Sequence, residues 1–336
     1  MSVKTVITTV AAALSVTLAL AGCGDSTGGA APGSSQAATA TTVSSSTIAP
    51  GTTTAAVPST TVAPSDISAS PTTTMVPPTT FARPTALVDE VVPVHGAGLH
   101  VHCDGVGPTT VVLIAGFKAD SSIWALVEPT VTRTTRVCSY DRFGLGASDA
   151  PPAPQTFATE ATDLHSLLQI AGEPGPYVMV GHSFGGAEAV TFASMFPSEV
   201  RGLLLLDASP PAWNTAICAV PDDGSDAAHV FQAVCAEQSS PANNAEHLDA
   251  PAAFADVGTI NSLDEFPMIV ATADHHSYAG LAASEEARLD DVWNDGQAHW
   301  ASLASSAQLI SVDHTGHNIQ VDRPDVVLDA VQELLQ

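Results

Sequence analysis

From about residue 87 onward, apolar residues fall into short unbroken runs and longer periodic stretches. The short runs have the length and composition of buried strands, and they cover residues 110–115, 136–140, 177–180 and 200–206. Between the second and third runs, residues 157–171 place apolar side chains at helical spacing and stop at Gly172. Strands that alternate with helices predict an α/β domain with a doubly wound, mostly parallel sheet.

The two ends of this domain carry patterns of their own. Residues 88–94 and 99–103 flank a turn at 95–98, which predicts a β-hairpin. Residues 308–312 predict a last strand, and a last helix is expected to begin near Pro324. We therefore expect one large domain that spans residues 85–336, a length sufficient for a substantial core.

Residues 208–266 interrupt the alternation of strands and helices. This segment mixes apolar and acidic residues with scattered Pro and Gly, which predicts short helices and loops. No Lys or Arg occurs between Arg201 and Arg288, so a carboxylate on a ligand would find no counter-ion in the segment.

The N-terminal quarter of the chain has a different composition. Residues 1–22 contain Lys4 and then an apolar run that is too short for a comfortable membrane span, which predicts an export signal. Residues 23–84 are rich in Thr, Ser, Ala and Pro and nearly free of large apolar side chains. Such a segment cannot bury enough surface to offset its ordering entropy, so we expect a disordered tether.

The end of the export signal resembles a bacterial lipobox. The residues are Leu20, Ala21, Gly22 and Cys23, and the resemblance implies cleavage before Cys23 and attachment of a lipid to its sulfur. A secretory signal that leaves Cys23 unmodified is the alternative. The expected location is the cell envelope, either lipid-anchored to the outer face of the bacterial cell membrane or secreted.

Charge and cysteine content narrow the possible partners. The formal net charge of -26 over 336 residues repels nucleic acid and anionic lipid surfaces, so we expect contact with a membrane through the lipid anchor only. Four cysteines remain besides Cys23, and in an oxidising compartment they could form two disulfides. Four free thiols are the alternative.

One short motif organises the domain. A strand-type run ends in Gly181-His-Ser183-Phe-Gly185, and apolar residues then recur at helical spacing until Pro197. A serine between strand and helix at G-x-S-x-G has its hydroxyl lifted out of a sharp turn, as a nucleophile requires. A turn-forming serine is the alternative, but the flanking strand and helix argue against it.

Five segments together resemble the α/β-hydrolase fold, in particular its serine esterase and peptidase branch. They are Gly116-Phe117, the glycine-rich loop 141–148, residues 181–186, the run that ends at Asp207, and Gly316-His317. The resemblance covers nearly all of the expected domain, and it implies that a cap at about 208–266 lies between the sixth and seventh strands.

The resemblance also implies an oxyanion hole and a general base. The backbone N–H groups of Phe117 and Phe184 match the oxyanion positions of the family. His317 matches the position of the base because it follows the last strand, with His314 as the alternative. With Ser183 as the nucleophile, the order nucleophile, acid, histidine is the one that the family uses.

The acid of this triad is less clear from the sequence. The family usually places it in a turn after the seventh strand, but where that turn would supply an aspartate this chain has His276. Some branches place the acid after the sixth strand, where this chain has Asp207. We expect Asp207 to be the acid, while Asp274 and acids in the cap remain alternatives.

The strand order of the family implies a pairing of the cysteines. It places the second strand beside the fourth, so that Cys103 and Cys138 lie within bridging reach. Cys218 and Cys235 would then close a loop within the cap.

Together these features imply a serine hydrolase that cleaves a small, neutral carboxylic ester or acyl substrate through an acyl-enzyme. No cofactor is implied, and the pair His100 and His102 beside Cys103 lacks the further ligands that a metal site would need. An aminopeptidase of the same fold and a non-catalytic surface lipoprotein that binds a partner are the alternatives.

Overall fold

The computed structural model describes residues 85–263 and 266–336. The expected export signal, the lipid attachment at Cys23 and the tether therefore lie outside the described residues. None of the described helices combines the length and apolar character that a membrane span needs.

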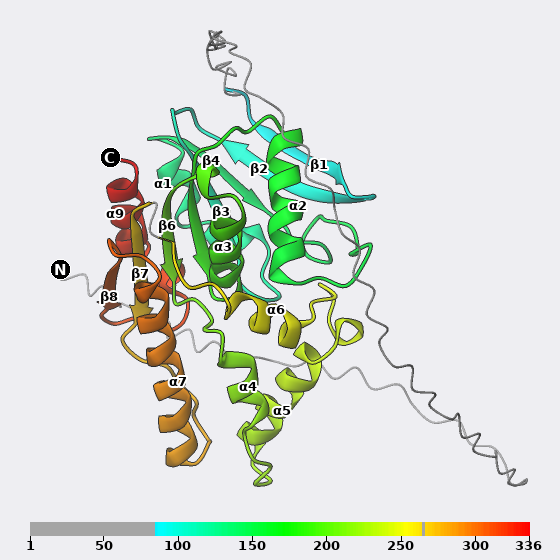
Figure 1. Ribbon diagram of the computed structural model, residues 1–336, viewed down its shortest axis with the longest axis vertical. Helices are drawn as coiled ribbons and strands as arrows, with labels where there is room; N and C mark the ends of the chain where they lie inside the picture. Colours follow the sequence, from blue (N-terminus) through cyan, green and yellow to red (C-terminus); the bar gives the residue numbers. More distant parts are fainter. Residues whose placement is uncertain (1–84, 264–265) are drawn as a thin grey trace, which may run out of the picture. The chain divides into compact units, whose positions relative to one another are not determined.

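Eight strands form one sheet in the order β1-β2-β4-β3-β5-β6-β7-β8 (Figure 1). Their bounds are β1 Val88–Val94, β2 Ala97–Asp104, β3 Thr110–Ile114, β4 Arg136–Tyr140, β5 Tyr177–His182, β6 Val200–Leu206, β7 Met268–Ala273 and β8 Gln308–Val312. Strand β2 runs antiparallel to β1 and β4, and the strands from β4 to β8 are parallel. This confirms the predicted mostly parallel sheet.

The helices are α1 Glu128–Val131, α2 Phe157–Ile170, α3 Phe184–Met195, α4 Trp213–Cys218, α5 Asp226–Gln238, α6 Ala250–Val257, α7 Ala283–Ser302, α8 Ile319–Asp322 and α9 Pro324–Leu334. Helices α2 and α3 pack on one face of the sheet, and α1 and α9 pack on the other (Figure 1). The sheet is therefore covered on both faces.

Alternate residues of the central strands enter two different cores. In β5, Met179 packs with the α2 and α3 side, whereas Val178 and Val180 pack with Trp124 and Val331 on the opposite side. Because both faces of these strands are buried, neither needs polar residues. This explains why the parallel strands appear in the sequence as unbroken apolar runs.

Helix α7 was not predicted from the sequence. Its twenty residues are largely polar, and its buried positions include Leu289, Trp293 and Trp300, spaced widely along one side. So sparse an apolar stripe gives a weak periodic signal. The helix follows β7 and covers both the sheet and part of the segment before it.

Residues between β6 and β7 form short helices and loops, as predicted. Helices α4 and α5 pack against residues that follow β7, including Tyr278 and Leu289, in a small apolar cluster. The material over the carboxyl ends of the strands therefore comes from two segments, 208–266 and about 275–293, and not only from the first.

Both cysteine pairs are disulfide-bonded. Cys103 in β2 lies directly opposite Cys138 in β4, with a Cα–Cα distance of 4.1 Å. Cys218, the last residue of α4, is bonded to Cys235 in α5 at 5.0 Å. One disulfide joins two strands of the sheet, and the other joins two helices of the cap.

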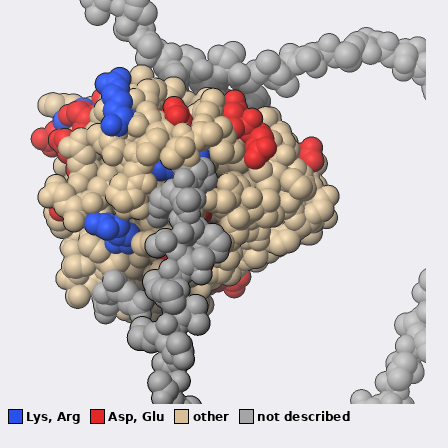
Figure 2. All heavy atoms as spheres, turned by 90° about the horizontal axis from the view of Figure 1, so that it is seen from above, with Lys and Arg blue, Asp and Glu red and all other residues tan. Residues whose placement is uncertain are grey.

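Charged side chains are few on the folded part. Figure 2 shows one face of the molecule, on which the blue and red atoms are scattered among neutral residues. Among the described basic residues, Arg136 and Arg142 are buried and do not contribute to the surface. On the face that Figure 2 shows, the basic side chains therefore lie apart from one another and form no continuous patch.

Candidate active site

Ser183 occupies a strained turn between β5 and α3. Its backbone has φ 55° and ψ −122°, a conformation that non-glycine residues rarely adopt. The turn brings backbone segments so close together that only glycine fits at two positions. A Cβ at Gly181 would lie 2.3 Å from the Gly185 oxygen, and a Cβ at Gly185 would lie 2.4 Å from the Ala115 oxygen. The glycines of the motif are therefore required by close backbone approach.

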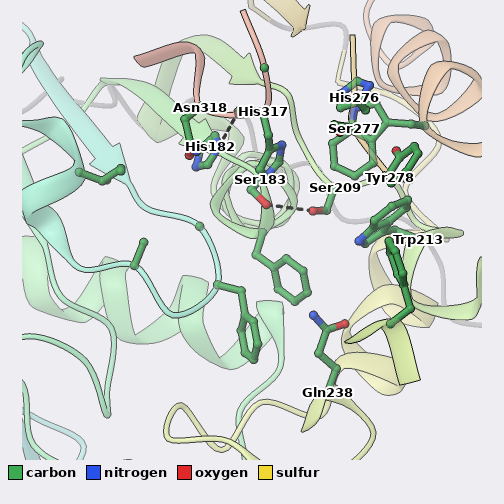
Figure 3. Close-up of a pocket in the computed structure, with 18 of the residues that line it drawn as sticks. His182, Ser183, Ser209, Trp213, Gln238, His276, Ser277, Tyr278, His317 and Asn318 are labelled. Carbon is green, nitrogen blue, oxygen red and sulfur yellow. Dashed lines mark hydrogen bonds between the residues drawn. The ribbon is translucent and has the colours of Figure 1, made fainter. Parts of the chain in front are cut away.

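The Ser183 hydroxyl contacts a second serine. Its Oγ lies 3.2 Å from Oγ of Ser209, and the Ser209 N–H donates to the Ser183 carbonyl oxygen at 3.0 Å (Figure 3). No hydrogen bond joins Ser183 to His317 within the described part of the chain, although both line the same cavity. Hydrogen bonds between a nucleophile and its base are often loose without substrate. Sequence reasoning missed Ser209 because no motif marks it.

Asp207 and His317 are brought together from positions 110 residues apart. Asp207 directly follows β6, and His317 lies in the loop after β8. The His317 Nδ1 donates to Asp207 Oδ2 at 2.7 Å. Asp207 is fully buried, whereas the His317 side chain is 39% exposed and faces the cavity. The imidazole thus has one nitrogen held by a carboxylate and the other free for proton transfer.

Asp207 accepts four further hydrogen bonds. Thr272 Oγ1, the Ala273 N–H and Trp293 Nε1 donate to Oδ1 at 3.1, 3.1 and 2.9 Å, and His276 Nε2 donates to Oδ2 at 2.8 Å. Burial alone raises the pKa of Asp207, but the hydrogen bonds from His276 and His317 outweigh burial and hold that pKa far below its ordinary value. These hydrogen bonds therefore favour the ionised form of Asp207.

His276 stands where the usual family turn would carry its aspartate. It places a second imidazole on the acid that follows β6, so two histidines share one carboxylate oxygen. The departure from the family pattern was visible in the sequence, but its consequence was not, because a contact between residues 207 and 276 depends on β6 and β7 being neighbours.

Asp274 holds the chain that leads to His317. Its carboxylate accepts the N–H groups of His314 at 2.9 Å and Thr315 at 3.2 Å, and it contacts His275 Nδ1 at 2.8 Å. The bond from the His314 N–H, together with the contact to His275, lowers the pKa of Asp274 to about 2. The structure thus places Asp274 on the backbone of this loop, while Asp207 contacts the His317 ring.

His182, the residue before Ser183, also contacts His317. Its Nε2 donates to the His317 carbonyl oxygen at 2.9 Å, and the two rings lie 4.7 Å apart (Figure 3). Burial and the neighbouring His317 lower the pKa of His182 to about 3. A neutral imidazole therefore joins the loop that carries His317 to the turn that carries Ser183.

Phe117 and Phe184, the expected oxyanion donors, both line the cavity beside Ser183, and their rings stack with centroids 5.0 Å apart. The Phe184 N–H is the first of α3, a position without an intrahelical acceptor. Both residues thus lie beside Ser183 at the cavity.

A buried arginine fixes the loop that carries Phe117. The Arg142 guanidinium donates to the carbonyl oxygens of Ala115 and Gly116. Its Nε donates to Glu246 Oε2 at 2.7 Å, and the other oxygen of Glu246 accepts the Lys118 N–H at 2.7 Å. Because Glu246 belongs to the segment between β6 and β7, this contact couples the cap to the loop. The glycine-rich motif marked the region but not this role.

Two more carboxyl groups surround Arg142. Glu160 and Glu188 are buried with oxygens 3.8 and 3.6 Å from the guanidinium, and the Tyr140 hydroxyl donates to Glu188. Burial raises the pKa of Glu188 to about 7 and raises that of Glu160 well above its ordinary value. The raised pKa values favour protonated carboxyl groups here, which would reduce the excess of negative charge around one buried cation.

A cavity of about 570 Å³ opens beside Ser183 and His317 (Figure 3). Trp213, Phe231 and Gln238 line it from the cap, and His276, Tyr278 and Trp293 line it from the segment after β7. No Lys, Arg, Asp or Glu is among its described lining residues. The cavity is thus electrically neutral apart from its histidines, with aromatic walls that suit an apolar ligand.

The residues considered for a metal have other partners. His100 contacts Asp89 and Asp141, and Cys103 is in a disulfide. Cys103, Cys138 and Glu173 are the group of potential ligands that lies close together in the described part of the chain, and its two sulfurs are bonded to each other. A disulfide has no thiolate to offer a metal.

Comparison with known proteins agrees with the fold. A family model described as the alpha/beta hydrolase fold matches residues 109–219. The protein YqjL of Bacillus subtilis is 23% identical over 255 residues, which are 74% of this chain and 93% of YqjL. Lipase LipV of Mycobacterium tuberculosis is 34% identical over 183 residues, which are 54% of this chain and 62% of LipV. Several other curated relatives match over only 15–38% of their own length.

Solved structures share this fold over a longer part of the chain than the family model matches. A thermophilic esterase from Thermogutta terrifontis is similar with a TM-score of 0.51 and 21% identity, covering 75% of this chain and 98% of the esterase. At this identity the likeness concerns the fold. The sheet order, the match at residues 109–219 and the solved relatives together show that the chain has the α/β-hydrolase fold.

Proposed function

We propose that the protein is a serine hydrolase that cleaves carboxylic esters through an acyl-enzyme intermediate. The observation that carries the proposal is the hydrogen bond of 2.7 Å between His317 and the buried Asp207, in the cavity that also exposes the strained Ser183. The similarity to a lipase of Mycobacterium tuberculosis supports an ester as the substrate.

In the proposed reaction, Ser183 Oγ attacks the ester carbonyl carbon while His317 Nε2 takes the hydroxyl proton. The carbonyl oxygen becomes an oxyanion, which the N–H groups of Phe117 and Phe184 stabilise. The C–O bond to the alcohol then breaks, and His317 gives its proton to the leaving alkoxide. Water attacks the acyl-enzyme with His317 again as the base, which releases the acid and restores Ser183.

Asp207 orients the base in this scheme. A carboxylate that accepts from Nδ1 keeps Nε2 unprotonated and turned to the nucleophile, and it stabilises the imidazolium that forms during the reaction. The pKa of Asp207, lowered by His276 and His317, keeps it charged throughout. Asp274 supports the same base indirectly, because it holds the loop at His314 and Thr315.

The cavity favours a neutral ester over a peptide with a free amino terminus. An aminopeptidase needs a carboxylate to bind the ammonium group, and no Asp or Glu is among the described residues that line the cavity. A panel that compares amino acid naphthylamides with neutral nitrophenyl esters distinguishes the two reactions. Turnover of the naphthylamides alone would contradict ester hydrolysis.

A fluorophosphonate probe tests the nucleophile directly. Because the probe reacts with activated serines, we expect it to label the wild-type protein and not Ser183→Ala, with ester turnover lost in parallel. Ser166→Ala, on α2 and remote from the cavity, is the matched control and should label normally. Absence of labelling in the wild type would favour a non-catalytic binding protein.

We also propose that the protein is exported and anchored by a lipid on Cys23. The lipobox-like residues before Cys23 support this, and stable anchoring needs two acyl chains or more. We expect the mature chain to partition into a detergent phase and Cys23→Ser to release or misprocess it. Recovery of a wholly soluble protein with a free N-terminal cysteine would contradict the anchor.

A further inference from the structure

Among the described cap residues that line the cavity, Gln238 carries an amide beside two aromatic side chains. Gln238 is the last residue of α5 and is only 3% exposed. Trp213 and Phe231 line the cavity from the same cap, and Phe184 lines it from the start of α3. A buried amide in such surroundings is unfavourable unless its donors and acceptors are satisfied.

A neighbouring amide sets the orientation of Gln238. The Asn214 Nδ2 donates to Gln238 Oε1 at 3.2 Å, and Asn214 is itself buried in α4. The Gln238 oxygen is therefore used within the cap, and its NH2 group is directed to the cavity (Figure 3). Within residues 85–263 and 266–336, no acceptor for that NH2 group is present.

From this geometry we infer that Gln238 is a specificity-determining residue, whose NH2 group donates to an oxygen of the substrate remote from the scissile ester. The inference rests on the proposed ester hydrolysis and names its substrate class: a neutral ester that carries a second acceptor oxygen, such as an ether or ketone, in the part that lies under the cap. A charged acceptor is disfavoured, because no Lys or Arg is among the described lining residues.

The NH2 group of Gln238 has no partner among the described residues, and this predicts a preference between oxygenated and plain esters. A plain hydrocarbon chain leaves the donor buried and unpaired, whereas an acceptor oxygen at the right distance satisfies it. Sites built to bond a polar group reject analogues that lack the group more strongly than apolar pockets reject one methylene. We expect a preference of about tenfold or more in kcat/KM for the oxygenated ester.

An oxygen scan tests the inference on the whole chain. The probes are 4-methylumbelliferyl esters of one straight-chain acid, together with analogues in which one methylene at a time is replaced by an ether oxygen or a ketone. The wild type should prefer one or two adjacent positions. Equal kcat/KM across the scan, with the plain ester still hydrolysed, would overturn the role of Gln238 and leave ester hydrolysis intact.

Two variants assign the preference to this residue. Gln238→Met has a similar volume without a donor, so we expect it to hydrolyse the plain and the oxygenated esters with similar kcat/KM, whatever its absolute rate. Asn214→Leu frees the amide to rotate and should weaken the preference without abolishing turnover. A preference that survives in Gln238→Met would also overturn the inference. Failure of every ester together with absence of fluorophosphonate labelling would instead contradict the proposed function itself.

Discussion

The floor and the roof of the cavity are built on different principles. The floor, formed by Ser183, Asp207 and His317, lies on the carboxyl ends of parallel strands and is held by hydrogen bonds. The roof, formed by Trp213, Phe231, Gln238 and Tyr278, is held by apolar contacts and one nearby disulfide. If the proposed reaction is correct, this difference predicts that reaction chemistry and substrate choice can be changed separately.

Several hydrogen bonds hold each residue of the floor in place. Asp207 alone accepts five hydrogen bonds, and both the carbonyl oxygen of His317 and its ring are held. Such redundancy keeps reacting groups within the narrow tolerance that catalysis requires.

The roof is specified by few contacts, and its parts come from two segments on either side of β7. Residues of α4 and α5 meet Tyr278 and Leu289 in a small cluster separate from the two cores of the sheet. Substitutions there alter the cavity without touching the strands, so the roof is where substrate preference can change at little cost to the fold.

The largest effect on kcat is expected when Asp207, the proposed acid, is replaced. Asp207→Asn should lower kcat by up to about ten thousandfold, because the base would lose its tautomer and its charge partner. Asp274→Asn should lower kcat far less, since Asp274 holds backbone N–H groups and not the ring of the base. Steady-state kinetics on both variants, with folding checked by circular dichroism, makes the comparison. Near-normal turnover by Asp207→Asn beside an inactive Asp274→Asn would reverse the assignment.

Removing the two disulfides one at a time tests whether folding stability and ester selectivity can be changed separately. The chain-entropy relation assigns about 4 kcal/mol to the bond of Cys103 with Cys138 and about 3 kcal/mol to that of Cys218 with Cys235, from separations of 35 and 17 residues. We expect both double Cys→Ala variants to have a lower Tm, but only the cap variant to change its ester profile. An altered profile in the sheet variant would contradict the separation.

The loss of folding stability at acidic pH should depend on His182. Its folded pKa of about 3 lies below the ordinary value of 6.5, so below pH 6.5 the unfolded chain binds a proton that the folded chain does not. Stability is therefore lost as the pH falls from 6.5 toward 3, by about 3 kcal/mol at pH 4.5.

His182→Gln keeps a donor for the His317 carbonyl oxygen but does not titrate. Urea unfolding between pH 7 and 4.5 should show a smaller loss of stability in this variant than in wild type. His229→Gln, at an exposed position in α5, is the control and should behave as wild type. Parallel pH curves for wild type and His182→Gln would show that His182 is not held neutral.

The smallest effect is expected at the link between cap and oxyanion loop. Glu246→Ala removes the acceptor of both the Lys118 N–H and the buried Arg142 Nε, and should lower kcat about tenfold with little change in KM, because the loop that carries Phe117 loosens. Glu237→Ala removes a cap carboxylate that forms an ion pair with the exposed Lys118 ammonium group, and should change kcat less than twofold. Equal effects of the two substitutions would mean that the cap does not position the loop.

Local patterns in the sequence were enough to predict the sheet and the position of the elbow. The unbroken run that became β6 and the glycines around Ser183 report constraints that act within a few residues, namely burial on both faces and close backbone approach. The contact of Asp207 with His317 and the pairing of Cys103 with Cys138 were predicted as well, but only through the strand order that the resemblance supplied.

Tertiary structure alone decided the rest of the site. His276 reaches Asp207 because β6 and β7 are neighbours, Ser209 meets Ser183 across a turn, and Trp293 arrives on α7, a helix whose sparse apolar stripe gave no clear signal. Glu246 and Gln238 gain their roles only when the cap is folded over the strands. Each of these depends on contacts between segments distant in the chain, which hydrophobic periodicity does not encode because it records burial and not the identity of the neighbour.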